Sequence, residues 1–353
     1  MKSITGIHDM TDSILQQPSG LLTQLLAQQL EPTSANKPML GEAEILFRVE
    51  RFVEDVRTNP YLDLYEFRTL LILYLNAFNQ VYDPSLAYCI RLKLFAWIKL
   101  EIDTLIHDQP YEALLGIEQY DLRCLQSLFT LGNELIQEEI KQRQQECEQD
   151  IVNLNNYINP LLIHYARLMV VRVDLKYRQV DQPWVTFNRF KEDMDQFRKI
   201  MGKGRGCFDN LHGSAWSMEQ GDEDGHYHAH ILLMYDANCH QEDVYKGMQV
   251  GQFWETITQG RGTYFNCNDP YYKFRLTRAN CCALGIIRRE DIDGQNKLRQ
   301  AAQYLVKDKQ HLRVKQSPNM KTFDHGQFKS KNRRGIEDTL AQIKQLASPN
   351  FGI

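Results

Sequence analysis

The chain has 353 residues, of which 43% are hydrophobic and 10% are aromatic, and this composition excludes disorder along most of its length. No apolar run is long enough to cross a bilayer or to serve as a signal peptide, so we expect a soluble, cytoplasmic protein with no membrane partner. Eight cysteines without a CxxC pair indicate neither a disulfide framework nor a zinc ribbon.

Charge is distributed unevenly along the chain. Residues 1–150 hold 12 Lys and Arg against 23 Asp and Glu, whereas residues 151–353 hold 29 against 22. The most basic stretch, residues 297–334, has 11 basic and 2 acidic side chains. Such a run is often only a solvated surface, but it is also the part of the chain best suited to phosphate contacts. The candidate DNA-binding residues in it are Lys309, Arg313, Lys315, Lys329, Lys331, Arg333 and Arg334.

The first half of the chain has helical periodicity. Residues 1–40 contain several prolines and many glutamines, and we expect them to form a flexible arm. Apolar side chains at three- and four-residue spacing then predict a helical domain over residues 41–155, beginning with Leu46, Val49, Phe52, Val53 and Val56. Its acidic balance disfavours direct DNA wrapping, and it could instead bind host replication proteins.

Strand and helix patterns alternate over residues 156–335, and residues 336–353 are expected to form a carboxy-terminal helix and tail. The polar, Gly-containing residues 221–225 predict a turn that joins two strands into a hairpin. The expected order is strand 168–177, helix 185–200, strands 214–220 and 226–235, helix 243–257, strand 262–266 and helix 296–309. We therefore predict an α+β fold in which an amino-terminal helical domain precedes a central antiparallel sheet flanked by helices.

Three histidines alternate along one predicted strand. His226, His228 and His230 would project from the same face, because side chains two positions apart in a strand point the same way. Imidazole is a common ligand of first-row divalent metals, although a surface strand can also carry histidines by chance. The hairpin would set Glu219 opposite residues 226–228, where its carboxylate could complete a metal site, unless the register slips by one residue. Asp174 on the first strand is the second candidate for that ligand.

The predicted helix over residues 296–309 carries a tyrosine and a lysine three positions apart. Tyr304 and Lys307 would share a helical face, so both could point at one phosphate. A phenol with a pKa of about 10 is a poor nucleophile at neutral pH unless positive charge stabilises the phenolate. A nearby metal ion and Lys307 would supply that charge. On its own, the same spacing is more typical of a core aromatic beside a solvated lysine.

Aromatic residues near the predicted strands could stack on bases. The candidates are Trp216, Tyr227 and Phe265, although each of them is more typical of a buried core. Tyr271 and Tyr272 lie in a segment that we expect to be a loop, where they would pack or stack on bases.

Together these residues resemble the HUH endonucleases that initiate rolling-circle replication. The resemblance covers residues 160–335 and is closest to the gene-two-type replication proteins of filamentous phages, the inoviruses, and related prophages. It depends on the strand VRVDL at 171–175, GHYHAHILLMYD from Gly225, QYLVKD from Gln303 and FDHGQFKSKNRR from Phe323. In this comparison the metal-binding pair is His228 and His230, with His226 and His228 as the alternative pair.

The resemblance implies a site-specific endonuclease and strand transferase with a single tyrosine nucleophile. Its two histidines and Glu219 would hold Mg²⁺ or Mn²⁺, and Tyr304 would form a covalent 5′-phosphotyrosine on single-stranded or hairpin DNA at the origin of a phage, prophage or plasmid. A nonenzymatic DNA-binding replication regulator is the alternative from a different functional class. A metal oxygenase or small-molecule hydrolase is the third hypothesis, but it would leave Tyr304 and Lys307 without a role.

Overall fold

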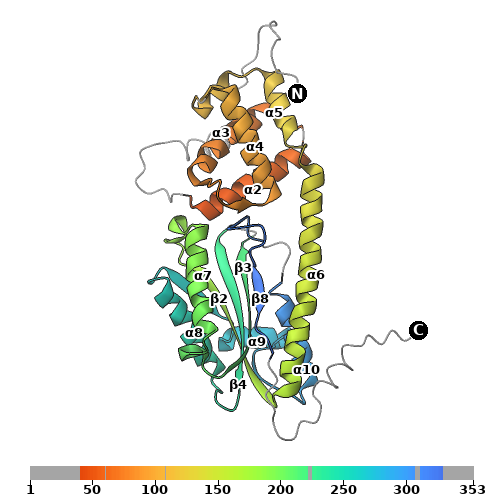
Figure 1. The fold of residues 1–353 in the computed structure, drawn as a ribbon, viewed down its shortest axis with the longest axis vertical. Helices are drawn as coiled ribbons and strands as arrows, with labels where there is room; N and C mark the ends of the chain where they lie inside the picture. The colour runs from red at the N-terminus through yellow and green to blue at the C-terminus, as the bar shows by residue number, and fades with distance from the viewer. Residues whose placement is uncertain (1–39, 60, 108, 222–224, 307–310, 329–353) are drawn as a thin grey trace, which may run out of the picture. The chain divides into compact units, whose positions relative to one another are not determined.

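The structure is a computed structural model that describes residues 40–328 except 60, 108, 222–224 and 307–310. Within these ranges it contains helices and a six-stranded antiparallel sheet, which confirms the α+β class (Figure 1). The predicted arm and the predicted carboxy-terminal helix at 336–353 lie outside the described residues. No helix in the described ranges is both long enough and apolar enough to cross a membrane.

Helices make up most of the described residues between 40 and 164. They bury one apolar stripe each; Leu46, Val49 and Val53 of the first described helix, for example, are fully buried. The bounds are α2 (Glu42–Thr58), α3 (Leu64–Val81), α4 (Ile90–Leu105), the 3₁₀ helix η1 (Tyr111–Gly116), α5 (Gln119–Leu128) and α6 (Asn133–His164). The predicted domain boundary at residue 155 falls inside α6, so one continuous helix connects the helical region to the sheet.

The sheet is built around β2 (Arg167–Tyr177). β4 (Tyr227–Asp236) pairs with one side of β2 and also with β3 (Leu211–Gln220), which in turn pairs with β8 (Phe323–His325). β5 (Gly262–Asn266) and β6 (Gly285–Arg288) both pair with the other side of β2. The predicted hairpin of β3 and β4 is confirmed. A separate two-stranded sheet joins β1 (Ala87–Tyr88) to β7 (Val314–Lys315).

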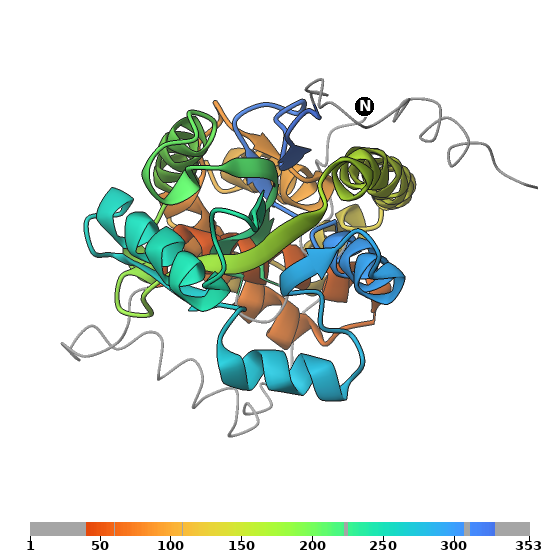
Figure 2. The same ribbon diagram turned by 90° about the horizontal axis from the view of Figure 1, so that it is seen from below.

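The two faces of the large sheet differ in what covers them. One face, which includes Val171, Val173 and Leu233, packs on α7 (Phe187–Met201) and α8 (Asp243–Ile257) in the larger core cluster. On the other face, Val170 and Met234 pack against α6 and α10 (Ile292–Gln303). Figures 1 and 2 show these helix pairs on opposite sides of the sheet. The remaining part of this second face carries polar side chains from β2, β3 and β4, and we call it the site face.

Helix α10 differs from its predicted bounds at both ends. It begins early because the Asp291 carboxylate caps it by accepting a hydrogen bond from the backbone N–H of Gly294. It ends at Gln303, so the prediction of a helix through Tyr304 and the two residues after it is wrong. The next three N–H groups donate to carbonyls three residues earlier, which tightens the last turn. This turn carries the buried Leu305 and Val306 into the core beside α6.

Residues 270–278 form a helix where a loop was expected. The Asp269 side chain accepts hydrogen bonds from the backbone N–H groups of Tyr271 and Tyr272, and Pro270 occupies the first turn, where a proline costs little. This helix, α9 (Pro270–Arg278), lies between strands β5 and β6 in the chain. The prediction missed the Asp-Pro start signal because the two adjacent tyrosines were interpreted as loop aromatics.

Candidate metal centre

The β3–β4 register places the predicted ligands on the site face. Glu219 is the cross-strand partner of His228, and Ser217 is the partner of His230. On the other side of β4, Asp174 of β2 is also the partner of His230. Directly paired residues point to the same face of a sheet, so all five side chains converge there. The predicted position of Glu219 opposite residues 226–228 is therefore confirmed.

Glu219, His228 and His230 bring their ligand atoms close together. Glu219 Oε2 lies 3.5 Å from His228 Nε2 and 3.3 Å from His230 Nε2. One ligand atom from each of the three lies within 4.8 Å of the others, a spacing that could hold a metal ion. Their side chains are only 4%, 13% and 8% exposed, respectively. Two imidazoles and a carboxylate suit a first-row divalent cation such as Mn²⁺, and Mg²⁺ would draw its remaining oxygen ligands from water or phosphate.

Hydrogen bonds on the far side of each imidazole orient Nε2 toward this group. Asp174 Oδ1 lies 2.7 Å from His230 Nδ1, so the carboxylate accepts the Nδ1 proton. The backbone carbonyl of His226 lies 3.2 Å from His228 Nδ1 and accepts in the same way. In both rings Nε2 is then the nitrogen available to a metal. His230 Nε2 is buried and faces Glu219 Oε2 at 3.3 Å, so this nitrogen and the carboxylate are directed at the same position.

Asp174 therefore supports a histidine and is not placed as a ligand. Its carboxylate also accepts a hydrogen bond from Arg172 Nε at 3.1 Å. Burial alone would raise the pKa of Asp174, but the hydrogen bond and positive charge from His230 and Arg172 hold this pKa well below its usual range. Asp174 consequently stays ionised and keeps accepting from His230.

Glu219 is held in place by Ser217. The Ser217 hydroxyl donates to Glu219 Oε1 at 2.9 Å, which leaves Oε2 directed at the two histidines. Burial would raise the pKa of Glu219, but hydrogen bonds and charge from His228 and His230 lower it to about 2. The sequence interpretation missed Ser217 and Arg172, although both are polar residues at alternate positions of otherwise apolar strands.

His226 lies outside the group of three. It precedes the first residue of β4, and the metal-binding geometry brings together His228 and His230 with Glu219. Its contribution to the group is the backbone carbonyl that accepts from His228. The structure thus favours the pair His228 and His230 over the pair His226 and His228.

Tyr304 occupies the residue directly after α10 and its side chain is 64% exposed. The two residues that follow it, Leu305 and Val306, line a cavity together with Ser217 and Glu219. The segment that carries Tyr304 therefore reaches the surroundings of the candidate metal ligands. Lys307, its predicted partner, lies outside the described residues.

Several predicted DNA contacts are buried. Arg313 is 3% exposed, and its Nε donates to Glu50 Oε2 at 2.5 Å, so it is a core residue and not a phosphate contact. Lys315 is half-buried in β7. Trp216 and Tyr227 are 6% and 3% exposed and cannot stack on a base. The other predicted cations, Lys309, Lys329, Lys331, Arg333 and Arg334, lie outside the described residues.

A second group with metal-ligand spacing consists of Glu50, Cys89 and His311. Two guanidinium groups already face its carboxylate, since Arg313 Nε lies 2.5 Å and Arg91 Nη1 lies 3.8 Å from Glu50 oxygens. These fixed positive charges would repel a cation. Burial and the charge of Glu50 also raise the pKa of the Cys89 thiol, which disfavours the thiolate that metal binding requires. We interpret this group as a structural ion-pair network.

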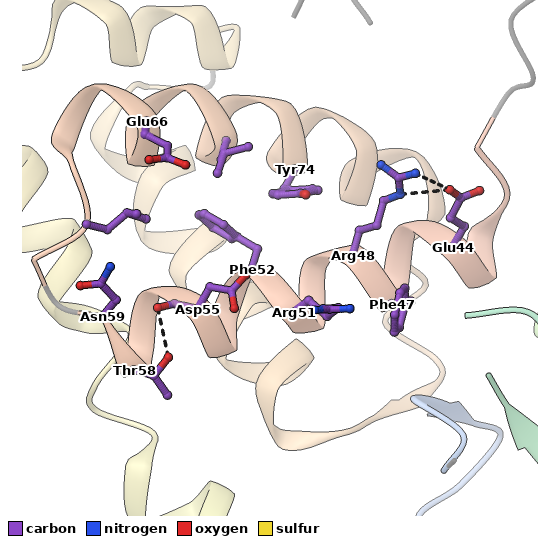
Figure 3. A pocket seen from close by; sticks show the side chains of 12 residues that line it. Glu44, Phe47, Arg48, Arg51, Phe52, Asp55, Thr58, Asn59, Glu66 and Tyr74 are labelled. Atoms are coloured by element: carbon purple, nitrogen blue, oxygen red, sulfur yellow. Dashed lines mark hydrogen bonds and ion pairs between the residues drawn. The ribbon is translucent and has the colours of Figure 1, made fainter. Parts of the chain in front are cut away.

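A separate pocket lies between α2 and α3 (Figure 3). Its lining includes positively and negatively charged side chains, such as Arg51 and Asp55. Arg48 forms an ion pair with Glu44 at 2.6 Å. None of the predicted catalytic, metal-binding or DNA-binding residues lines it. The predicted metal ligands Glu219, His228 and His230 lie instead on the site face.

No protein-family model, curated protein or solved structure matches the chain. Function is therefore inferred from the chemistry of the site.

Proposed function

We propose that this protein is a metal-dependent endonuclease that nicks and rejoins single-stranded DNA to initiate rolling-circle replication. The observation that carries the proposal is the convergence of Glu219, His228 and His230 on one sheet face, beside a cavity lined by the residues that follow Tyr304. Lys176 of β2 points to the same face and is exposed, so it could contact a phosphate beside the site. Mg²⁺ or Mn²⁺ bound there would offset the negative charge that develops on the scissile phosphate.

The proposed reaction is a transesterification. The Tyr304 oxygen forms a bond to phosphorus while the bond from phosphorus to the 3′ oxygen breaks. The phenol proton passes through solvent to the departing 3′ oxygen, and the products are a 5′-phosphotyrosine and a free 3′ hydroxyl. No nucleotide cofactor or oxidant is needed, and the reverse step rejoins the strand. Glu219 and the two histidines hold the ion, while Ser217 and Asp174 orient them.

The proposal is tested by trapping the covalent intermediate. Purified full-length protein is incubated with labelled single-stranded DNA from its own replicon and Mn²⁺, and adducts are resolved on a denaturing gel. We expect an adduct that needs the metal and is absent from the Tyr304→Phe variant. Tyr120→Phe is the matched control, because Tyr120 is also 64% exposed but lies on α5 in the helical region.

Binding of the DNA without any adduct, across candidate origin strands and both metals, would overturn the enzymatic proposal. The protein would then be a DNA-binding replication regulator. An adduct that persists in Tyr304→Phe but disappears in Glu219→Gln would keep the nickase and reject Tyr304 as its nucleophile.

A further inference from the structure

Helix α9 presents aromatic and basic side chains to solvent. None of its residues is buried, and Tyr271 and Phe274 are 72% and 58% exposed. Arg275 and Arg278 are exposed as well, and the Arg278 guanidinium lies 5.9 Å from the centre of the Phe274 ring. These four residues follow the spacing i, i+3, i+4 and i+7, so they form one stripe along the helix. Figure 2 shows α9 at the outer edge of the sheet region.

The stripe is connected to the candidate metal centre through the sheet. Phe265 of β5 is the cross-strand partner of Asp174, which is in turn the partner of His230. Phe265 therefore points to the site face, about two strand spacings, or roughly 10 Å, from His230. Phe265 is 42% exposed, and its ring meets the Tyr272 ring of α9 edge to face, with centroids 5.0 Å apart. Phe265 thus links the site face to α9.

The charges along this path are suited to a polyanion. Lys176 follows Asp174 on the same face of β2 and is exposed. The charged α9 side chains that point to solvent are the two arginines, because Lys273 is paired with Asp243 at 2.7 Å. Exposed aromatic rings interleaved with cations are the combination that binds single-stranded nucleic acid, with bases stacked on rings and phosphates held by charge. Two guanidinium groups beside three exposed rings offer charge and stacking surface together, which suits the single-stranded DNA of the proposed function.

We infer that Phe265, Tyr271, Phe274, Arg275 and Arg278 form a binding track for the single-stranded DNA that enters the metal centre. This α9 track rests on the proposed function and specifies where its substrate lies. Bases stack on the three rings, and the two arginines contact phosphates. Arg313, Trp216 and Tyr227 were candidate DNA contacts but are buried. The α9 track is the surface that we propose for DNA in their place.

A binding assay tests the inference. A dye-labelled oligodeoxythymidine is titrated with the full-length protein, and binding is measured by fluorescence anisotropy in EDTA and again with Mn²⁺. We expect the double variant Tyr271→Ala/Phe274→Ala to bind at least about tenfold more weakly. Arg275→Gln/Arg278→Gln should reduce the slope of log affinity against log salt by about 1.4, because two phosphate contacts are lost. All four side chains are exposed, so the variants should keep the wild-type melting temperature.

Tyr61→Ala/Tyr120→Ala is the matched control, since these tyrosines are 88% and 64% exposed in the helical region, and it should bind as the wild type does. Wild-type binding that the α9 variants retain would overturn the track while leaving the proposed nickase intact. A wild type that binds no single-stranded DNA under either condition would overturn both. Weaker binding in the α9 variants accompanied by loss of a wild-type dimer in sedimentation would instead make α9 a self-association surface and overturn the track.

Discussion

His230 is held between two carboxylates that act on different nitrogens. Asp174 Oδ1 lies 2.7 Å from Nδ1, and Glu219 Oε2 lies 3.3 Å from Nε2. Burial would lower the pKa of His230, but the hydrogen bonds and negative charge of Asp174 and Glu219 raise it. A cation beside Nε2 would replace the proton there and be stabilised by the same negative charges. We therefore expect the Asp174 side chain to contribute to metal affinity without touching the metal.

The Asp174→Asn variant tests this contribution. An amide keeps the size of the carboxylate but removes its charge and its preference for the Nδ1 proton, so we expect Mn²⁺ affinity to fall by about 10- to 100-fold. Titration of the full-length protein by electron paramagnetic resonance measures the affinity. Asp236→Asn is the control, because Asp236 lies at the opposite end of β4 and pairs with His212 at 3.3 Å. Equal affinity in both variants would reject an orienting role for Asp174.

The β3–β4 hairpin is connected to the helical region at the end that carries the candidate metal ligands. Gln220, next to Glu219, is fully buried, and its side chain points to the opposite face of the strand. Its Nε2 donates to the carbonyl of Ala43 at 2.8 Å, and its Oε1 accepts from the backbone N–H of Arg313 at 3.1 Å. One amide thus fixes the end of β3 to α2 and to the segment before β7.

Replacing Gln220 with Met should disturb both stability and metal binding. The variant leaves two buried backbone groups without their partner, so we expect the free energy of unfolding to fall by about 1–3 kcal/mol. Mn²⁺ affinity should fall too, because Glu219 loses its fixed position. Gln126→Met is the control, since the Gln126 side chain also donates to a carbonyl, that of Leu62 at 3.1 Å, but within the helical region. If both variants lose similar stability and keep full affinity, Gln220 is structural only.

Much of this arrangement could be predicted from the order of residues. The alternating histidines and the turn residues between two apolar strands were sufficient to predict the hairpin, whereas its register stayed open by one residue and is given by the pairing of Glu219 with His228. The end of α10 was not predictable from periodicity, because Leu305 and Val306 fit a helix as well as they fit the tight turn that buries them. The burial of Trp216 and Tyr227 was the favoured prediction, but base stacking stayed open for both, because the packing of the strands against α7 and α2 is set by contacts distant in sequence. Tyr227, for example, donates to Glu42 at 2.8 Å.

The helical region and the sheet share one hydrophobic core, and a buried ion pair joins them. Glu50 of α2 accepts from Arg313, which directly precedes β7, and the Arg313 guanidinium lies 4.7 Å from the centre of the Phe47 ring. Burial would raise the pKa of Glu50, but His311, Arg313 and Arg91 lower it to about 2. The Glu50 carboxylate thus connects the acidic first half of the chain to the basic second half. It must stay ionised for the ion pair with Arg313 to persist.

This pKa predicts a pH dependence of global stability. A carboxylate whose folded pKa is lowered contributes stability above its unfolded pKa of about 4.3, and this stability is lost as pH falls toward the folded value of about 2. The Glu50 contribution amounts to about 3 kcal/mol. Urea unfolding of the wild type should show a decline over this pH range that is shallower in Glu50→Gln. An equal decline in both proteins would show that Glu50 does not carry the dependence.

Calorimetric titration with Mn²⁺ decides whether the metal centre exists. The full-length wild type is compared with variants in which each candidate ligand on the site face is replaced singly by Gln. Glu219→Gln, His228→Gln and His230→Gln should each abolish or strongly weaken the binding of one ion per chain, whereas His226→Gln should retain it, because that side chain lies outside the group. If the wild type binds no Mn²⁺, or if binding survives all three ligand substitutions, the site face is not a metal centre and the proposed nickase has no basis.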